Sequence, residues 1–311
     1  MKKSILLLSA LFLLLNVGMA QIVSENKYQE EWNKVYALED GNLPRSIIES
    51  VDSIFQKAIK EENTPQVIKA LLYKNKAKQR IDRDDNIQIF SDLKSLLIKA
   101  ESKSDRALLY SMLAELYGNY YYENRWTIDH RTNLEYTPED MKTWSKNNVY
   151  DKVIECLNQS VADAETLKGY TTKEYEDIIF MGISAPEYYP TMYDFLMYRA
   201  IAILRKHEVY QADYRKYDEP HTWELLSVSA KEFVKIDIDR DNKYIIFRYY
   251  QQYLKDLLSR NMIPSIIHTE MDKIEYMSGL KSNQIKDKEI AFAERLFDEY
   301  KENESALELI L

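Results

Sequence analysis

The chain has 311 residues, and its 51 acidic and 42 basic side chains give a net charge of −9. An acidic surface repels phosphate groups, so the composition argues against nucleic acids and anionic membranes as partners. With only six Gly, seven Pro and 30% charged residues, the chain suits long helices with solvated outer faces.

Residues 1–20 have the pattern of a signal peptide. Lys2 and Lys3 precede an apolar run at 5–15, and Gly18, Met19 and Ala20 form a small-residue cleavage site. The run is too short for a membrane span, and no later stretch is apolar for long enough. We therefore expect a cleaved leader and a soluble, exported product, periplasmic or secreted, with no integral membrane span.

Helical periodicity begins near residue 44. One apolar stripe predicts a helix at 44–62 with Pro44 in its first turn. Thr64 as N-cap and Pro65 predict the start of a second helix, which runs to about Ile81. The short connection makes a helical hairpin, the unit of tetratricopeptide-like and other α-solenoid arrays. The expected buried residues are Ile47, Ile48, Val51, Ile54, Phe55, Ala58 and Ile59 in the first helix, and Val67, Ile68, Leu71 and Leu72 in the second.

Further helices are predicted at 85–101 and 104–125, before an irregular segment at 125–136. Thr137, followed by Pro138 and two acids, has the pattern of an N-cap that restarts a helix. Another helix is predicted at 148–167, and Thr171 with Glu174 matches a capping box. Residues 182–190 form the clearest loop. There we place the boundary between an N-terminal helical-hairpin region, 21–181, and a C-terminal helical region, 190–311, continuous with the first.

Beyond this loop, helices are predicted at 191–208, 220–235, 242–260, 263–279 and 284–302, and residues 306–311 look like the start of another. Their apolar stripes comprise Tyr193, Met197, Ala200, Ile201 and Leu204, and then Ile290, Ala293, Phe297 and Tyr300. No pair of strands is predicted. The expected fold class is all-α: stacked antiparallel helix pairs in a tetratricopeptide-like α-solenoid, although the consensus spacing of true tetratricopeptide repeats is absent.

The motifs that could carry chemistry are incomplete. His207 and Glu208 begin like a zinc-protease helix, but Gln211 occupies the position of the second histidine. Residues 237–242 resemble an EF-hand loop that lacks its glycine and has Arg248 in place of the bidentate glutamate, so we expect a solvated acidic loop, with weak calcium binding as the alternative. Cys156, the one cysteine, is expected to be a small buried hydrophobe. We predict no enzymatic activity, no metal site and no cofactor.

One aromatic cluster is the candidate ligand surface. Tyr120, Tyr121, Tyr122 and Trp126 could stack on sugar rings or anchor a peptide, and they could equally pack in the core. Consecutive tyrosines point around a helix, so we expect one or two of the four rings to be exposed.

Four segments, at 43–73, 109–126, 137–150 and 190–196, resemble the N-terminal helical region of large bacterial alpha-2-macroglobulin-like proteins. The resemblance spans roughly residues 28–300. It implies a secreted precursor whose helical region precedes β-sandwich macroglobulin domains, a bait region and a thioester-type domain that together trap proteases. The chain stops at Leu311 without those segments, so we carry over neither the trapping mechanism nor any functional residue. Cys156 and Gln159 have the family's thioester spacing, but they lie in the wrong region and lack the usual Gly-Glu between them.

We therefore expect a non-catalytic helical interaction module that resembles the N-terminal part of an alpha-2-macroglobulin-like protease inhibitor. Its expected partners are proteins of the bacterial cell envelope, with proteases and macroglobulin domains as candidates. The alternative is an exported glycan-binding protein of the starch-utilisation type, which rests on the exposed part of the aromatic cluster. The missing lipobox cysteine and the short chain argue against that alternative.

Overall fold

A computed structural model describes residues 27–82, 87–134, 136–179, 182, 185–206, 227–238, 245–279 and 286–309. Every regular element within these residues is a helix, which confirms the predicted all-α class. Within the same residues, no helix combines the length and the apolar character that crossing a membrane requires.

The elements and their bounds are α2 (Gln29–Asp40), α3 (Pro44–Lys60), α4 (Thr64–Ile81), α5 (Gln88–Lys99), α6 (Lys103–Ile128), the 3₁₀ helix η1 (Met141–Thr143), α7 (Lys146–Ser160), α8 (Ala164–Leu167), η2 (Thr172–Tyr175), α9 (Ala185–Tyr188), α10 (Met192–Lys206), α13 (Ala230–Phe233), α14 (Ile245–Arg260), α15 (Ile263–Gly279), α16 (Lys286–Tyr300) and η5 (Glu304–Leu309).

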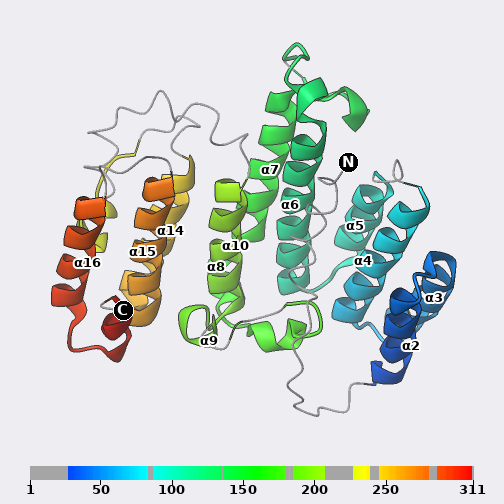
Figure 1. Ribbon diagram of the computed structural model, residues 1–311, viewed down its shortest axis with the longest axis horizontal. Helices are drawn as coiled ribbons and strands as arrows, with labels where there is room; N and C mark the ends of the chain where they lie inside the picture. Colours follow the sequence, from blue (N-terminus) through cyan, green and yellow to red (C-terminus); the bar gives the residue numbers. More distant parts are fainter. Residues whose placement is uncertain are drawn as a thin grey trace.

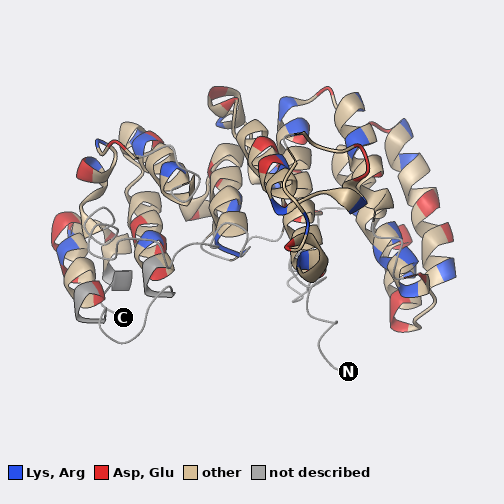
Figure 2. Ribbon diagram, turned by 90° about the horizontal axis from the view of Figure 1, so that it is seen from above, with Lys and Arg blue, Asp and Glu red and all other residues tan. Residues whose placement is uncertain are grey.

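The longer helices stand side by side in a row that follows the chain from α2 at one end to α16 at the other (Figure 1). Most packing is between neighbours in this row, and α10 joins its two halves by packing on both α6 and α14. Basic and acidic residues are interspersed over the helices along the row (Figure 2). The row therefore presents long solvated faces, as the composition predicts.

The hairpin of α3 and α4 shows how local sequence sets these elements. Pro44 is the first residue of α3, where its missing N–H costs nothing, as predicted. The N-cap of α4 is Asn63, whose side chain accepts a hydrogen bond from the Gln66 backbone N–H at 3.2 Å. The predicted N-cap, Thr64, is therefore the first helical residue instead. The side-chain amide oxygen of Asn63 satisfies a free backbone N–H of the first turn, so the helix begins one residue earlier than predicted.

Buried apolar side chains form two separate clusters. One belongs to α2, α3 and α4 and is centred on Trp32, Val51 and Ile54. The other has members from Ile68 to Ala306, on both sides of residues 182–190. Phe55 and Leu96 pack at the edges of both clusters. The end of the row that holds α2 thus has a core of its own.

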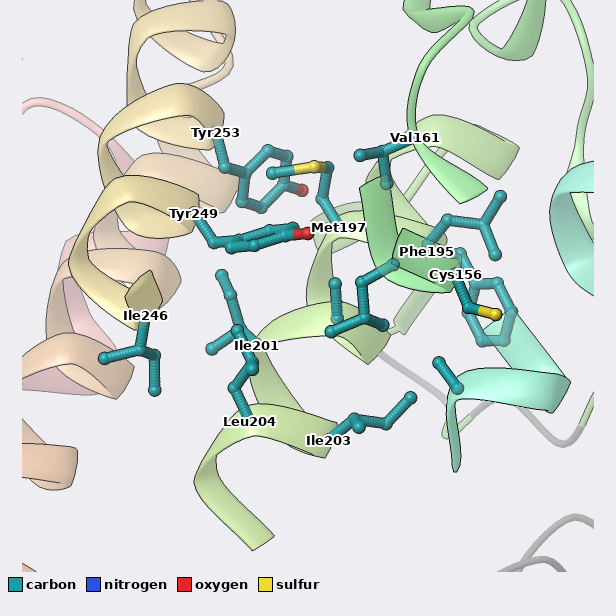
Figure 3. Close-up of a cluster of buried hydrophobic side chains, with 14 of the residues drawn as sticks. Cys156, Val161, Phe195, Met197, Ile201, Ile203, Leu204, Ile246, Tyr249 and Tyr253 are labelled. Atoms are coloured by element: carbon teal, nitrogen blue, oxygen red, sulfur yellow. The ribbon is translucent and has the colours of Figure 1, made fainter. Parts of the chain in front are cut away.

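Helix α10 lies at the centre of the larger cluster. Its predicted stripe is confirmed, because Tyr193, Met197, Ala200, Ile201 and Leu204 are all buried. Figure 3 shows Met197 and Ile201 on the side of α14, next to Tyr249 and Tyr253. In the same view, Phe195 lies near Cys156 of α7 on the opposite side. A helix that is buried around most of its circumference ties both halves of the row together.

Asp194 anchors the first turn of α10. Its carboxylate is completely buried and accepts hydrogen bonds from Thr191 Oγ1 at 2.6 Å and from Arg260 of α14 at 2.5 Å. On the other flank of α10, Arg199 donates to Ser111 at 3.0 Å and to Glu115 at 2.8 Å, both in α6. These polar contacts fix the position of α10 relative to its two neighbours.

Several predicted boundaries are wrong. No helix starts at Thr137: Asp140 caps the short η1, and α7 begins only after Ser145, which forms a capping box with Asn148. Thr171 precedes the 3₁₀ helix η2 but makes no capping hydrogen bond. These sites carry the right residue types, but tertiary contacts of the connecting segments decide where each helix begins.

Other corrections concern the second half of the chain. The predicted loop at 182–190 contains the short helix α9, and residues 306–309 belong to the 3₁₀ helix η5 rather than to an α-helix. Of the helix predicted at 220–235, residues 220–226 lie outside the described residues, and Ala230–Phe233 form the four-residue helix α13. Of the stripe predicted for α16, Tyr300 is buried and Ala293 and Phe297 are half-buried, but Ile290 is 51% exposed. The helix also buries Phe292 and Leu296, which were not predicted. In the first hairpin, Ile59 of the predicted stripe is also exposed, at 42%.

Candidate functional site

The hairpin of α6 and α7 projects beyond the neighbouring helices of the row (Figure 1). Helix α6 has 26 residues and starts after Ser102, whose hydroxyl accepts from the Asp105 N–H. Residues 129–145 connect its far end to α7. This connection, with the last turns of α6, forms the hairpin tip.

The base of the hairpin tip is firmly packed. Tyr117 stacks on Trp144 with ring centroids 5.5 Å apart, and the Trp144 indole N–H donates to the Pro138 carbonyl at 2.7 Å. Arg131 donates to the Trp144 carbonyl at 2.6 Å, and the Tyr120 hydroxyl donates to the Met141 carbonyl at 3.2 Å. Buried aromatic rings and hydrogen bonds to backbone carbonyls therefore anchor the described parts of the connection to the two helices.

Large apolar side chains lie exposed on this rigid base. Trp126 is 77% exposed, Tyr136 66% and Leu134 40%. The Arg125 guanidinium lies 5.2 Å from the ring centroid of Tyr122 and 5.8 Å from that of Trp126, so it stacks with both rings. Trp, Tyr and Arg are the residues that most often dominate the binding energy of protein interfaces. Their exposure on a projecting element marks this tip as the candidate site.

The structure divides the predicted aromatic cluster. Tyr120 and Tyr121 are buried, and the Tyr121 hydroxyl donates to Asp129 at 2.8 Å. Tyr122 is half-buried, and Trp126 is exposed. The helix turns about 100° per residue, so consecutive rings face the core and then the solvent. Tyr120 and Tyr121 are therefore unavailable to a ligand in this structure.

Sequence analysis missed two residues of the site, Leu134 and Tyr136. They fall in the segment expected to be irregular, where no periodicity separates buried from exposed positions. The available indication was their type: large apolar residues in an otherwise polar connection are unusual and often functional.

The other residues considered for chemistry do not converge. Cys156 is buried, which raises the pKa of its thiol to about 12 and leaves it unreactive at neutral pH. Gln159 is exposed, so the two do not face each other as a thioester pair would. His207, His221 and residues 239–242 of the EF-hand-like segment lie outside the described residues. Within the described residues, no three His, Cys, Asp or Glu side chains are grouped as metal ligands.

A buried charged pair lies between α15 and its neighbours. Glu270 and Lys273 are completely buried, with Lys273 Nζ 3.7 Å from Glu270 Oε1 and 4.2 Å from the ring centroid of Phe233. Neither side chain makes a hydrogen bond. Loss of water raises the pKa of Glu270 and lowers the pKa of Lys273 to about 8. Sequence analysis expected solvated helix charges here, and only the packing of α13 and α16 over α15 buries them.

Comparison with known proteins identifies no relative of this chain: no protein-family model, no curated protein and no solved structure matches it. The fold and the candidate site together define an all-helical protein with exposed aromatic side chains at the tip of a projecting hairpin.

Proposed function

We propose that this chain is a non-catalytic helical interaction module of the bacterial envelope, exported after loss of residues 1–20, which binds a partner protein through the hairpin tip. One observation carries the proposal: Trp126 and Tyr136 are exposed on a projecting hairpin whose base is rigid. A rigid base lowers the conformational entropy lost on binding, and aromatic anchors contribute large contact areas.

The row of helices supports the finer architecture that we propose, an α-solenoid of tetratricopeptide-like helix pairs. Such arrays expose long surfaces to partners, and each helix pair packs mainly on the next. The ionisable groups also support a binding role rather than a catalytic one. Arg199, Glu115 and Asp194, for example, form ties between helices instead of facing an open cleft.

Site-specific photo-cross-linking tests the proposal directly. A photoreactive residue replaces Trp126 in cells of the source organism, and the matched control replaces Ile290 of α16, which is 51% exposed and lies away from the tip. We expect one envelope protein to cross-link at 126 and not at 290. Trp126→Ala should then weaken binding of the purified partner about 30-fold, the effect of a hot spot of about 2 kcal/mol. Identical cross-links at both positions, or unchanged affinity, would contradict the proposal.

The resemblance to the N-terminal region of alpha-2-macroglobulin-like proteins supports a narrower form, in which the partners are proteases or macroglobulin domains. The genomic sequence that follows the codon of Leu311 tests this form. Macroglobulin domains in the same or the next reading frame are the expected finding, and their absence would favour an independent adaptor.

Glycan binding remains the second candidate because the exposed ring of Trp126 could stack on a pyranose. A glycan array with wild type and Trp126→Ala decides between the two. Binding that the substitution abolishes would favour the glycan-binding function. A silent array, together with a cross-linked protein, would favour the interaction module.

A further inference from the structure

A groove lies between the α3–α4 hairpin and the α5–α6 pair, at the end of α6 opposite to the hairpin tip. It encloses about 320 Å³, at the lower end of the range of about 300–1,000 Å³ for binding pockets. At 1.5 Å per residue, the 21 positions from Asp105 to Trp126 separate groove and tip by about 30 Å along α6. The groove is thus a second site, independent of the proposed function of the tip.

The floor of the groove is apolar and marks where the two hydrophobic clusters meet. Ala58 and Val67 belong to the N-terminal cluster, Leu109 belongs to the larger one, and Leu96 packs against both. The side chains of the two clusters do not cover the junction between them. Ile59, at 42% exposed, stands at its side, so apolar surface continues from the floor to the outside. A groove of this kind accommodates apolar side chains of a partner.

The rim of the groove is predominantly acidic. Glu62, Glu101 and Asp105 line it, against the single cation Lys99. Glu62 and Glu101 are exposed, and Asp105 accepts a hydrogen bond from the Tyr175 hydroxyl at 2.6 Å. Lys103 does not offset them, because it pairs with Asp163 at 2.6 Å. The rim therefore complements a positively charged ligand.

The backbone at Glu62 is unusual for its residue type. Its φ is 55°, in the left-handed region that ends a helix most readily with Gly or Asn. The two other non-glycine residues described in this region are both asparagines, Asn42 and Asn261. Glutamate is disfavoured there, yet this position holds a carboxylate at the rim of the groove. The backbone strain agrees with a role for that charge.

We propose that the groove binds an extended peptide segment of a partner protein, with an apolar side chain on the floor and Lys or Arg side chains at the rim. The floor supplies burial of apolar surface, and the rim selects a basic rather than an acidic sequence.

The test measures fluorescence anisotropy of three labelled peptides with the purified chain. The probe is Gly-Lys-Leu-Phe-Lys-Gly-NH₂ labelled at its N-terminal amine, and its controls replace both Lys by Glu, or replace Leu and Phe by Gly. We expect saturable binding of the probe and at least tenfold weaker binding of each control. Absence of saturable binding, or equal binding of any control, would overturn the proposal; equal binding of the Gly control would show general charge attraction only.

Two variants locate the binding to the groove. Ala100→Trp fills it, and Glu62→Lys with Glu101→Lys reverses the rim at exposed positions that should leave folding intact. Each should weaken binding of the probe at least tenfold, whereas Trp126→Ala should leave it unchanged. If Ala100→Trp fails to fold, the charge-reversed variant decides: unchanged affinity there refutes the groove as the site. Because the tip variant is tested separately, failure here leaves the proposed function of the tip unaffected.

Discussion

Replacing the buried Glu270–Lys273 pair by apolar side chains is expected to stabilise the protein. The two charges lie 3.7 Å apart with no hydrogen bonds to compensate for the water they lost. Burial lowers the pKa of Lys273 and raises that of Glu270, so keeping both groups charged at neutral pH costs free energy. The double variant Glu270→Leu with Lys273→Met should therefore be about 2–3 kcal/mol more stable at pH 7, within the usual range for such replacements.

The single variant Lys273→Met should have the opposite effect. It leaves Glu270 buried with Arg295 as the remaining cation that acts on it, so the cost should be at or below the lower end of the range of about 3–5 kcal/mol for breaking a buried pair. Opposite signs for the single and double variants distinguish charge burial from a general change in packing. Urea unfolding followed by circular dichroism gives the free energies, and thermal melting should rise by about 4–6 °C for the double variant.

The pH dependence supplies a separate check. The folded state holds the Lys273 proton less tightly than the unfolded state, so wild type gains stability as pH rises from about 8 towards 10.5. The advantage of the double variant over wild type should shrink across that window. A double variant less stable than wild type by more than about 1 kcal/mol, or a constant difference between pH 7 and pH 10, would refute the reasoning.

Three further outcomes are expected. Asp194→Ala should lower the free energy of unfolding by about 1.5–3 kcal/mol in urea titrations, since it removes the buried carboxylate that Thr191 and Arg260 bond, while Arg260 keeps Asp256 as a second partner; a loss under 1 kcal/mol would count against the Asp194 contacts. Burial raises the pKa of Cys156 to about 12, so a thiol reagent at pH 8 should label it only in urea; rapid labelling of the native protein would disprove its burial. Trp144→Ala should destabilise by about 3–5 kcal/mol, whereas Trp126→Ala should stay within about 0.5 kcal/mol; equal losses in thermal melts would show that Trp126 is structural.

Helices with a strong apolar periodicity and clear residue signals at their ends, such as a first-turn proline, were predictable from the sequence. Helix α15 has the predicted bounds, Ile263–Gly279, and α3 begins at Pro44 as expected. The start of α7 at Lys146 lies two residues from the predicted 148, but the helix ends at Ser160 instead of 167. A helix start at Thr137 was predicted from its N-cap pattern and is absent. The contacts that fix the connection, such as Trp144 donating to Pro138, depend on the folded hairpin.

The candidate site shows the same contrast between residues in helices and residues in connecting segments. Trp126 was one of four candidates, because aromatic residues that point around a helix cannot all face the core, but the pattern did not tell which of the four is exposed. Tyr136 was missed because its segment has no period. The groove between the helix pairs was beyond any sequence pattern. Its floor joins Val67 and Leu109, which come together only when two hairpins pack side by side.

The separate core of α2, α3 and α4 has a consequence for how the chain is made. All its buried members lie between Tyr28 and Ala77, and Leu96 of α5 packs only at its edge, so most of it can form before the later helices are synthesised. We expect this segment to collapse around Trp32 while the remaining helices are still emerging, because domains assemble from the N-terminus as they are produced. Each later pair then adds to a surface that already exists, and the first three helices act as the template on which the row grows.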